Sequence, residues 1–326
     1  MNNMLYPWQI ESWKMLQSKR ERMPHALLIH GPQGIGKLQL VERFTQSLLC
    51  ESGDARGAPC GVCSGCRWFA AGSHPDFRRV EPEALARQSA AGDESDEPAP
   101  ARSAKPSLEI KVDQVRALDD FLNLQSHRGG PRVALIHPAE AMNPNAANAL
   151  LKGLEEPPGR AQFILVSHRP ARLLATIRSR CVAVPVPMPD ASTSLAWLES
   201  QGAGDAASRW LAFASGSPLR ALQYLQAGAA LARRRQALEA RDLDALGTAD
   251  DREQLEELAE VLQKHALDRA FAAYCGRAKY GAAAGSKSGV AWLRYARLMG
   301  RNRALARHPL NPRLFAYEML AAMPRE

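Results

Sequence analysis

The sequence of 326 residues predicts an α/β domain, with a parallel sheet covered by helices on both faces, followed by two helical domains. Three observations predict this fold class. Short apolar runs alternate with helical periodicity in the first half, and a glycine-rich loop joins the first run to the first helical pattern. Almost no strand pattern occurs after the prolines at 185, 187 and 189. Strands that alternate with helices are typical of a parallel sheet with helices on both faces.

In the first half, compact apolar runs predict buried strands, and apolar residues at helical spacing predict the helices between them. The expected strands are 26–29, 77–80, 132–136 and 162–167, and the expected helices are 38–49, 112–124 and 145–154. In the second half we expect helices at 191–201, 205–214 and 217–227, and a helical remainder from 229 with breaks near 245–249 and 281–289. The predicted domains are therefore 1–186, 187–228 and 229–326.

Residues 82–107 interrupt the α/β pattern. The stretch is rich in alanine, proline, serine and acidic residues, with an acidic run at 93–97. Such a composition buries too little apolar surface to offset the entropy of ordering. We therefore predict a disordered surface insertion, with a functional acidic segment as the alternative.

A phosphate loop is predicted at 31–37, between a strand and a helix. The segment fits the pattern G-x-x-x-x-G-K, with Gly31, Gly34, Gly36 and Lys37 as the candidate phosphate-binding residues. Backbone amides of such a loop and the amino terminus of the next helix bind anions. Position 38 normally holds a serine or threonine that ligates magnesium, but here it is leucine. The loop can still accept phosphate, but it should handle magnesium nucleotides poorly.

The strand expected to carry catalytic carboxylates lacks them. In P-loop ATPases this apolar strand ends in an acidic residue. The corresponding run 133–136 ends in His137 and Pro138, and Glu140 is the first acid beyond it. Phosphoryl transfer depends on charge placement, so we expect no useful hydrolysis. The alternative to a phosphate loop at 31–37 is a chance match of its glycines to the pattern in an unrelated fold.

Four of the six cysteines lie within 50–66 and predict a structural zinc site. Their spacing is C-x9-C-x2-C-x2-C, formed by Cys50, Cys60, Cys63 and Cys66. Cysteines two residues apart in a tight turn can direct both sulfurs at one tetrahedral ion, and four thiolates leave no coordination position open. The alternative is four reduced surface cysteines. Cys181 and Cys275 stand alone, and we expect both to be inert.

Bulk composition excludes a membrane span and leaves the partner open. No apolar run reaches the length that a span needs, and the first residues show no signal-peptide pattern, so we expect a cytoplasmic protein. The net charge of +8 and the pI of about 9.4 favour a polyanionic partner, nucleic acid first. Direct contact with DNA stays open, because basic proteins often bind none.

Taken together, these motifs resemble the clamp-loader subunits of bacterial DNA polymerase III, which belong to the AAA+ class. The four-cysteine segment follows the helix after the phosphate loop, as it does in that family. The other segments similar to the family are His-Pro-Asp-Phe at 74–77, Ala-Asn-Ala-Leu-Leu-Lys-Gly-Leu-Glu-Glu-Pro-Pro at 147–158, Ser-Arg-Cys at 179–181 and Gly-Ser-Pro at 216–218.

The resemblance implies an AAA+ P-loop domain with a zinc module at 50–66, a small helical lid domain and an all-helical collar. The departures at Leu38, His137 and Pro138 are similar to the family's member that does not hydrolyse ATP. In that case the chain holds structural zinc, and nucleotide binding is doubtful. Its implied partners are the gamma/tau and delta subunits, with the sliding clamp and primed DNA reached through the complex.

The same resemblance implies a role for Arg180 of the Ser-Arg-Cys motif. It would be an arginine finger, acting in trans on the ATP site of a neighbouring subunit. The structural alternative is that Arg180 caps a helix or pairs with an acid. Arg220, four residues after Gly216, matches a second-sensor arginine, but we expect a structural role because this chain has no competent ATP site.

The sequence disfavours three rival functions. An active AAA+ ATPase of the gamma/tau type, in replication or recombination, is disfavoured because the acidic pair is absent. A small P-loop kinase is disfavoured by the Ser-Arg-Cys segment and the helical second half. In a zinc-knuckle nucleic-acid binder we would expect more aromatic residues for base stacking than Trp68 and Phe69.

Overall fold

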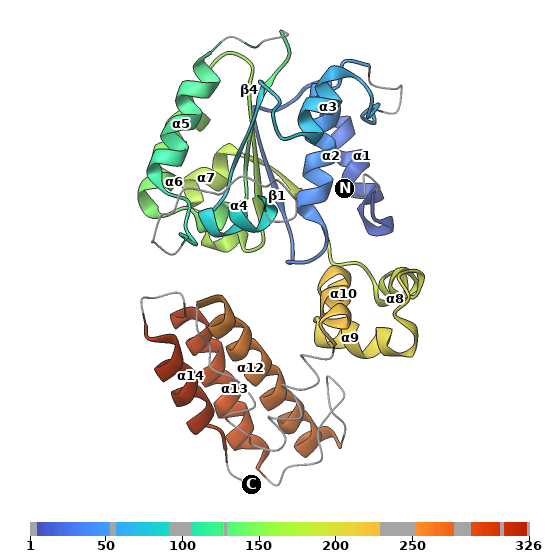
Figure 1. Ribbon diagram of the computed structural model, residues 1–326, viewed down its shortest axis with the longest axis vertical. Helices are drawn as coiled ribbons and strands as arrows, with labels where there is room; N and C mark the ends of the chain where they lie inside the picture. Colours follow the sequence, from blue (N-terminus) through green and yellow to red (C-terminus); the bar gives the residue numbers. More distant parts are fainter. Residues whose placement is uncertain are drawn as a thin grey trace. The chain divides into compact units, whose positions relative to one another are not determined.

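In the computed structural model the chain forms two compact units, residues 1–189 and 190–326, which Figure 1 shows. The structure describes residues 5–52, 57–90, 106–124, 126, 129–228, 252–276, 288–306 and 310–324.

The first unit is built on a parallel five-stranded sheet in the order β2-β3-β4-β1-β5. Its strands are β1 (Ala26–His30), β2 (Phe77–Val80), β3 (Arg132–Ile136), β4 (Ala161–Ser167) and β5 (Val182–Pro185). The four expected strands are confirmed. The fifth, β5, was not expected, because it is a short run that ends in proline, and only its pairing with β1 makes it a strand.

Helices cover both faces of this sheet, which confirms the predicted fold class, and Figure 1 shows them on either side of the strands. Successive side chains of a strand point to opposite faces, so each strand feeds two cores. Leu27 and Ile29 pack with α1 and α2, whereas Ala26 and Leu28 pack with α5, α6 and α7. These helices are α1 (Ile10–Ser18), α2 (Lys37–Leu49), α5 (Val112–Asn123), α6 (Pro144–Glu155) and α7 (Ala175–Arg180).

The register of the sheet brings several loops to one edge. His30, the last residue of β1, pairs with Ser167, the last residue of β4, and β3 ends beside β4 at Ile136. All strands run in the same direction, so the segments that follow them leave from the carboxyl edge, where ligands of open α/β sheets bind. The phosphate loop, His137 and His168 therefore lie at this edge.

The prediction of disorder over 82–107 is wrong for its first part. Residues 83–90 form helix α4 (Glu83–Ala90). Its first turn is held from outside: Glu83 accepts a hydrogen bond from Ser107 N at 3.2 Å and pairs with Lys111 at 2.7 Å. Composition could not reveal these partners, because they lie more than twenty residues away. Residues 91–105 of the predicted insertion lie outside the described residues.

The second unit is helical throughout the part that the structure describes. Helices α8, α9 and α10 agree with the three expected helices and share a small core, and a second core joins α12, α13 and α14. The bounds are α8 (Ala191–Ser200), α9 (Ala207–Phe213), α10 (Pro218–Gln226), α12 (Arg252–Cys275), α13 (Gly289–Leu305) and α14 (Pro312–Ala321). Separate lid and collar domains stay a prediction, since residues 229–251 lie outside the described residues. The same holds for the break expected at 245–249 and for residues 281–287 of the break expected at 281–289.

Short helices complete the described chain. They are α3 (Ser64–Ala70), which the sequence did not predict, and the single turns Pro7–Gln9, Ala139–Ala141, Pro170–Arg172 and Gly204–Ala206. None of the helices in the described ranges is long and apolar enough to cross a membrane.

Candidate functional site

The phosphate loop has the backbone that its glycines predict. Gly34 and Gly36 have φ of 78° and 81°, a region that residues with a side chain rarely adopt. Gly36 precedes α2, and a Cβ atom there would lie 2.6 Å from the ring of Tyr6. The loop therefore needs glycine at this position both for its conformation and for the close approach of the first residues of the chain.

The first residues of the chain fix the loop from one side. Trp8 Nε1 donates to the carbonyl of Ile35 at 2.9 Å, and Gln9 Nε2 donates to the carbonyl of Gly36 at 2.7 Å. Buried carbonyls that are already bonded hold their peptide planes in place. This support was not visible in the sequence, since Trp8 and Gln9 each lie 27 positions before the residue whose carbonyl they bind.

Lys37 lies inside the protein, with 2% of its surface exposed. Its Nζ donates to the carbonyl of Pro32 in the same loop at 2.5 Å. Burial lowers the pKa of Lys37 to about 8, and the nearby charge of Glu140 opposes this shift. The next residue, Leu38, packs against the core between α2 and the sheet, so no hydroxyl is offered to a metal ion from this position.

Two histidines directly follow β3 and β4 at the edge of the sheet that carries the loop. The rings of His137 and His168 lie 5.3 Å apart, edge to face. Burial lowers the pKa of both side chains to about 3, with further lowering from His168 on His137 and from Lys37 on His168. Both are therefore neutral at physiological pH. Glu140, the acid that follows the proline, accepts a hydrogen bond from His168 N at 2.9 Å.

This edge of the sheet thus holds neutral imidazoles where a P-loop ATPase holds carboxylates. The sequence singled out His137, but not His168 as a member of the site. The position of His168 directly after a buried strand was the available indication. Phosphate contacts from backbone amides and Lys37 are compatible with this arrangement, whereas hard magnesium ligands are not provided by Leu38, His137 or His168.

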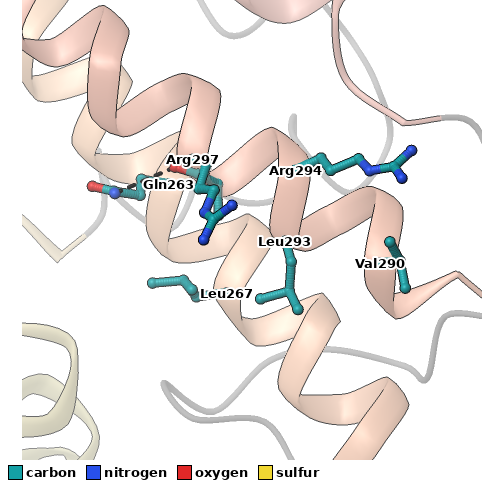
Figure 2. Close-up of a pocket in the computed structure, with 7 residues that line it drawn as sticks. Gln263, Leu267, Val290, Leu293, Arg294 and Arg297 are labelled. Carbon is teal, nitrogen blue, oxygen red and sulfur yellow. Dashed lines mark hydrogen bonds between the residues drawn. The ribbon is translucent and has the colours of Figure 1, made fainter.

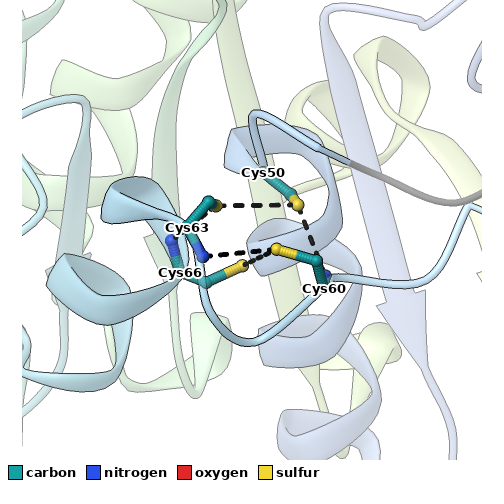
Figure 3. A group of neighbouring side chains, drawn as sticks. All are labelled: Cys50, Cys60, Cys63 and Cys66. Carbon is teal, nitrogen blue, oxygen red and sulfur yellow. Dashed lines mark hydrogen bonds between the residues drawn. The ribbon is translucent and has the colours of Figure 1, made fainter.

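The four clustered cysteines converge on one point, as Figure 3 shows. Their sulfur atoms all lie within 4.8 Å of one another, with Cys50–Cys63 at 3.9 Å and Cys60–Cys66 at 4.0 Å. Four thiolates around one zinc ion at about 2.3 Å place their sulfurs about 3.8 Å apart. The donor set and its spacing therefore fit tetrahedral zinc.

Backbone amides support the same cluster. The N–H groups of Cys60, Cys63 and Cys66 each donate to a cysteine sulfur at 3.4 Å. Although burial raises the pKa of the Cys63 thiol, hydrogen bonds from Cys66 and its other neighbours lower it to about 6. Donors aimed at sulfur stabilise the thiolate, which is the form that binds metal. Gly61, with φ of 77°, allows the tight turn between Cys60 and Cys63.

Arg180 is the last residue of α7 and lies on the same unit as the phosphate loop. Its Nη1 donates to the carbonyl of Thr176 at 3.0 Å, and its Nη2 pairs with Glu155 Oε1 at 2.5 Å. About a third of the side chain (34%) is exposed. Beside it, burial raises the pKa of Cys181 to about 11, so this thiol is unreactive at neutral pH.

Arg220 lies in the second unit, where it binds a buried acid. Its Nη2 pairs with Glu260 at 2.6 Å and bonds the hydroxyl of Tyr224 at 2.7 Å. Lys264 and Arg303 also bind Glu260, each at 2.7 Å. These contacts join α10, α12 and α13, and they support the structural role expected of Arg220.

The second unit also carries a groove of about 460 Å³ between α12 and α13. Leu267, Val290 and Leu293 form its apolar surface, and Figure 2 shows Arg294 and Arg297 beside them. None of the candidate residues singled out in the sequence lines this groove.

Comparison with known proteins supplies the wider context. Residues 8–190 match the family model described as DNA polymerase III, delta subunit. The chain is 44% identical over 220 residues to DNA polymerase III subunit delta' of Pseudomonas aeruginosa, which covers 67% of this chain and 60% of that protein. It is 34% identical over 225 residues to subunit delta' of Escherichia coli K12, and this match covers 68% of this chain and 61% of that protein.

Two further similarities are more distant. DNA polymerase III subunit tau of Salmonella typhimurium is 33% identical over 161 residues, which covers 49% of this chain and 21% of that protein. A gamma subunit-related protein of DNA polymerase III from Thermotoga maritima has a TM-score of 0.47 at 17% identity, over 95% and 97% of the two chains. The chain thus matches about three fifths of the length of the delta' relatives named above.

Proposed function

The chain belongs to the DNA polymerase III delta subunit family, and from that membership we propose that it is the delta-prime subunit of a bacterial clamp loader. In this role it supports loading of the sliding clamp onto primed DNA without hydrolysing ATP itself. It assembles with the gamma/tau and delta subunits in the cytoplasm, and it meets the clamp and the DNA through that complex.

The observation that carries the inactive role is the set of residues around the phosphate loop. Leu38 is half-buried against the core, and His137 and His168 are neutral where charge on magnesium ligands is needed. Catalysis of phosphoryl transfer rests on metal ions and placed charges. A loop that keeps Lys37 but lacks those groups can bind an anion without activating water.

The observation that carries the positive role is the partly exposed guanidinium of Arg180. An arginine finger stabilises negative charge on a γ-phosphate bound by another subunit and can contribute about 10³–10⁵ in rate. The four cysteines hold zinc in a structural role on this proposal, since four thiolates occupy every position of a tetrahedral ion.

The function is tested by reconstituting the chain with the ATPase subunits, the delta subunit, the clamp and primed DNA from the same organism. We expect Arg180→Ala to lower stimulated ATP turnover by about 10²-fold or more. Lys37→Ala, a change in the inactive loop, should leave turnover within about twofold of the unmodified complex, because the rate belongs to the neighbouring sites. Unchanged turnover with Arg180→Ala contradicts the proposed finger.

A second candidate, an ATPase of the gamma/tau type, is favoured by the similarity to subunit tau. The same preparation decides between the two. Robust ATP turnover by the isolated chain that is lost with Lys37→Ala would support the ATPase and overturn the inactive role.

A further inference from the structure

The guanidinium of Arg180 is held by two contacts, from two different helices. Arg180 ends α7, and its long side chain would otherwise sample many rotamers. The carbonyl of Thr176 binds Nη1 at 3.0 Å from within the helix, and Glu155 binds Nη2 at 2.5 Å from the end of α6. The two terminal nitrogens of the guanidinium are thus held by different elements, which defines both its position and its plane.

The two anchor points lie next to residues of the core. Leu154, next to Glu155, has 1% of its surface exposed, and Ile177, one turn before Arg180, has none. Both side chains belong to the core that joins α6 and α7 to the sheet. A carboxylate next to a buried leucine at a helix end therefore stands at a defined place relative to α7.

The pairing leaves the guanidinium able to bind a second anion. Arginine has five N–H donors. The Thr176 carbonyl engages one donor on Nη1 and Glu155 engages one on Nη2, which leaves three donors beyond these two contacts. Since the side chain is 34% exposed, an oxygen from outside the chain can reach it. Glu155 can thus stay bound while Arg180 binds a phosphate.

The ion pair between Arg180 and Glu155 should contribute little to the stability of the fold. Glu155 is 49% exposed, and ion pairs at such exposure contribute little to folding. Preorganised charge, by contrast, acts strongly on a developing transition state, because no reorganisation is needed when the charge appears. The contact is suited to orienting a side chain rather than to holding the domain together.

We propose that Glu155 is the positioning residue of Arg180: it orients the guanidinium for the γ-phosphate of a nucleotide held by a neighbouring subunit. The inference rests on the proposed function of Arg180 and adds a second residue of this chain to the neighbour's site. Glu155 touches no substrate and acts only through Arg180.

The test uses the reconstituted clamp loader with ATP, clamp and primed DNA. We expect Glu155→Ala to lower kcat by about three- to tenfold with the KM for ATP within about twofold, because orientation matters in the transition state. Glu155→Gln, which keeps the volume and one acceptor, should lie between Glu155→Ala and the unmodified chain. Glu156→Ala is the matched control, since Glu156 is also exposed and follows directly in sequence.

A double-variant cycle separates positioning from a structural role. If Glu155 acts through Arg180, adding Glu155→Ala to Arg180→Ala lowers kcat no further. An additional, independent loss would overturn the proposal, and so would a Glu155→Ala complex with unchanged or raised kcat. Melting temperatures of the isolated variants should agree within about 2 °C, which corresponds to a weak exposed pair.

The two proposals fail in different ways. If Arg180→Ala itself leaves turnover unchanged, the arginine finger is wrong and the positioning role falls with it. If Arg180→Ala lowers turnover and both Glu155 variants do not, the finger stands and only the role of Glu155 is overturned.

Discussion

The ammonium group of Lys37 is buried, with 2% of the residue surface exposed. Desolvation lowers its pKa to about 8, and the hydrogen bond to the carbonyl of Pro32 supplies one acceptor but no charge. A buried ammonium group without a full counter-charge costs stability. A bound anion would supply the missing charge, so the free loop carries a cost that phosphate binding can offset.

This cost gives a prediction for Lys37→Met. The folded pKa lies below the ordinary value of 10.5, so the cost is complete below about pH 8 and disappears as the pH rises to about 10.5. We expect Lys37→Met to raise the free energy of unfolding by about 1–3 kcal/mol at pH 7. Denaturant unfolding should show this gain shrinking between pH 8 and 10.5.

The control for this experiment is Lys14→Met, because Lys14 is 67% exposed. It should change the free energy of unfolding by less than about 0.5 kcal/mol. A loss of stability with Lys37→Met at pH 7 would show that the hydrogen bond to Pro32 outweighs desolvation.

Among the elements, helices α10, α12 and α13 are joined by one buried carboxylate. Glu260 has 7% of its surface exposed and binds the side chains of Arg220, Lys264 and Arg303. Burial alone would raise the pKa of Glu260, but these three cations outweigh it and lower the pKa to about 2. Loss of the carboxylate leaves several cations without their partner, which is expensive in a buried site.

We predict that Glu260→Gln lowers the free energy of unfolding of the second unit by about 3–5 kcal/mol at pH 7. The folded pKa lies below the ordinary 4.5, so the contribution of Glu260 is fully present above about pH 4.5 and is lost as the pH falls to about 2. The difference between variant and unmodified chain should narrow over that range in thermal unfolding.

Glu318→Gln is the matched control for Glu260→Gln, since Glu318 is exposed on α14 of the same unit. Its effect should stay within about 0.5 kcal/mol. An equal loss at pH 7 and pH 3 would mean that packing, rather than the charge of Glu260, joins these helices.

The whole molecule consists of two units, each with its own cores. The sheet of the first unit separates two apolar clusters, and the described residues of the second unit form two others. Units that bury separate cores can unfold in separate steps. The cysteine cluster belongs to the first unit and Glu260 to the second, so each unit can be perturbed alone.

We therefore expect two calorimetric transitions in the full chain. Removal of zinc by a chelator, or Cys63→Ser, should lower the temperature of one transition, because a structural zinc site contributes its binding energy to folding. Zinc analysis should find about one ion per chain before treatment. Cys275→Ser is the control, since Cys275 is exposed and lies in the second unit. A shift of both transitions after chelation would contradict independent units.

Local pattern was enough to predict most of the first unit and much of its candidate site. The apolar runs of β1, β3 and β4 predict buried strands, and their side chains lie in the two cores of the sheet. The glycines of the loop predict a turn with positive φ, which Gly34 and Gly36 adopt. The cysteine spacing likewise determines where the sulfurs can meet. Leu38 and His137 are departures from a motif, which are visible in the sequence alone.

Other features depended on residues far apart in the chain. The strand β5 needs β1, the helix α4 needs Ser107 and Lys111, and His168 meets His137 only across the sheet. Arg180 was singled out by its motif, but its partner Glu155 lies twenty-five positions away. The sequence by itself determined which groups are present and their local conformation, because backbone preference and burial period are local. The tertiary structure decided which charges meet, because Coulomb attraction and desolvation act between groups that only folding brings together.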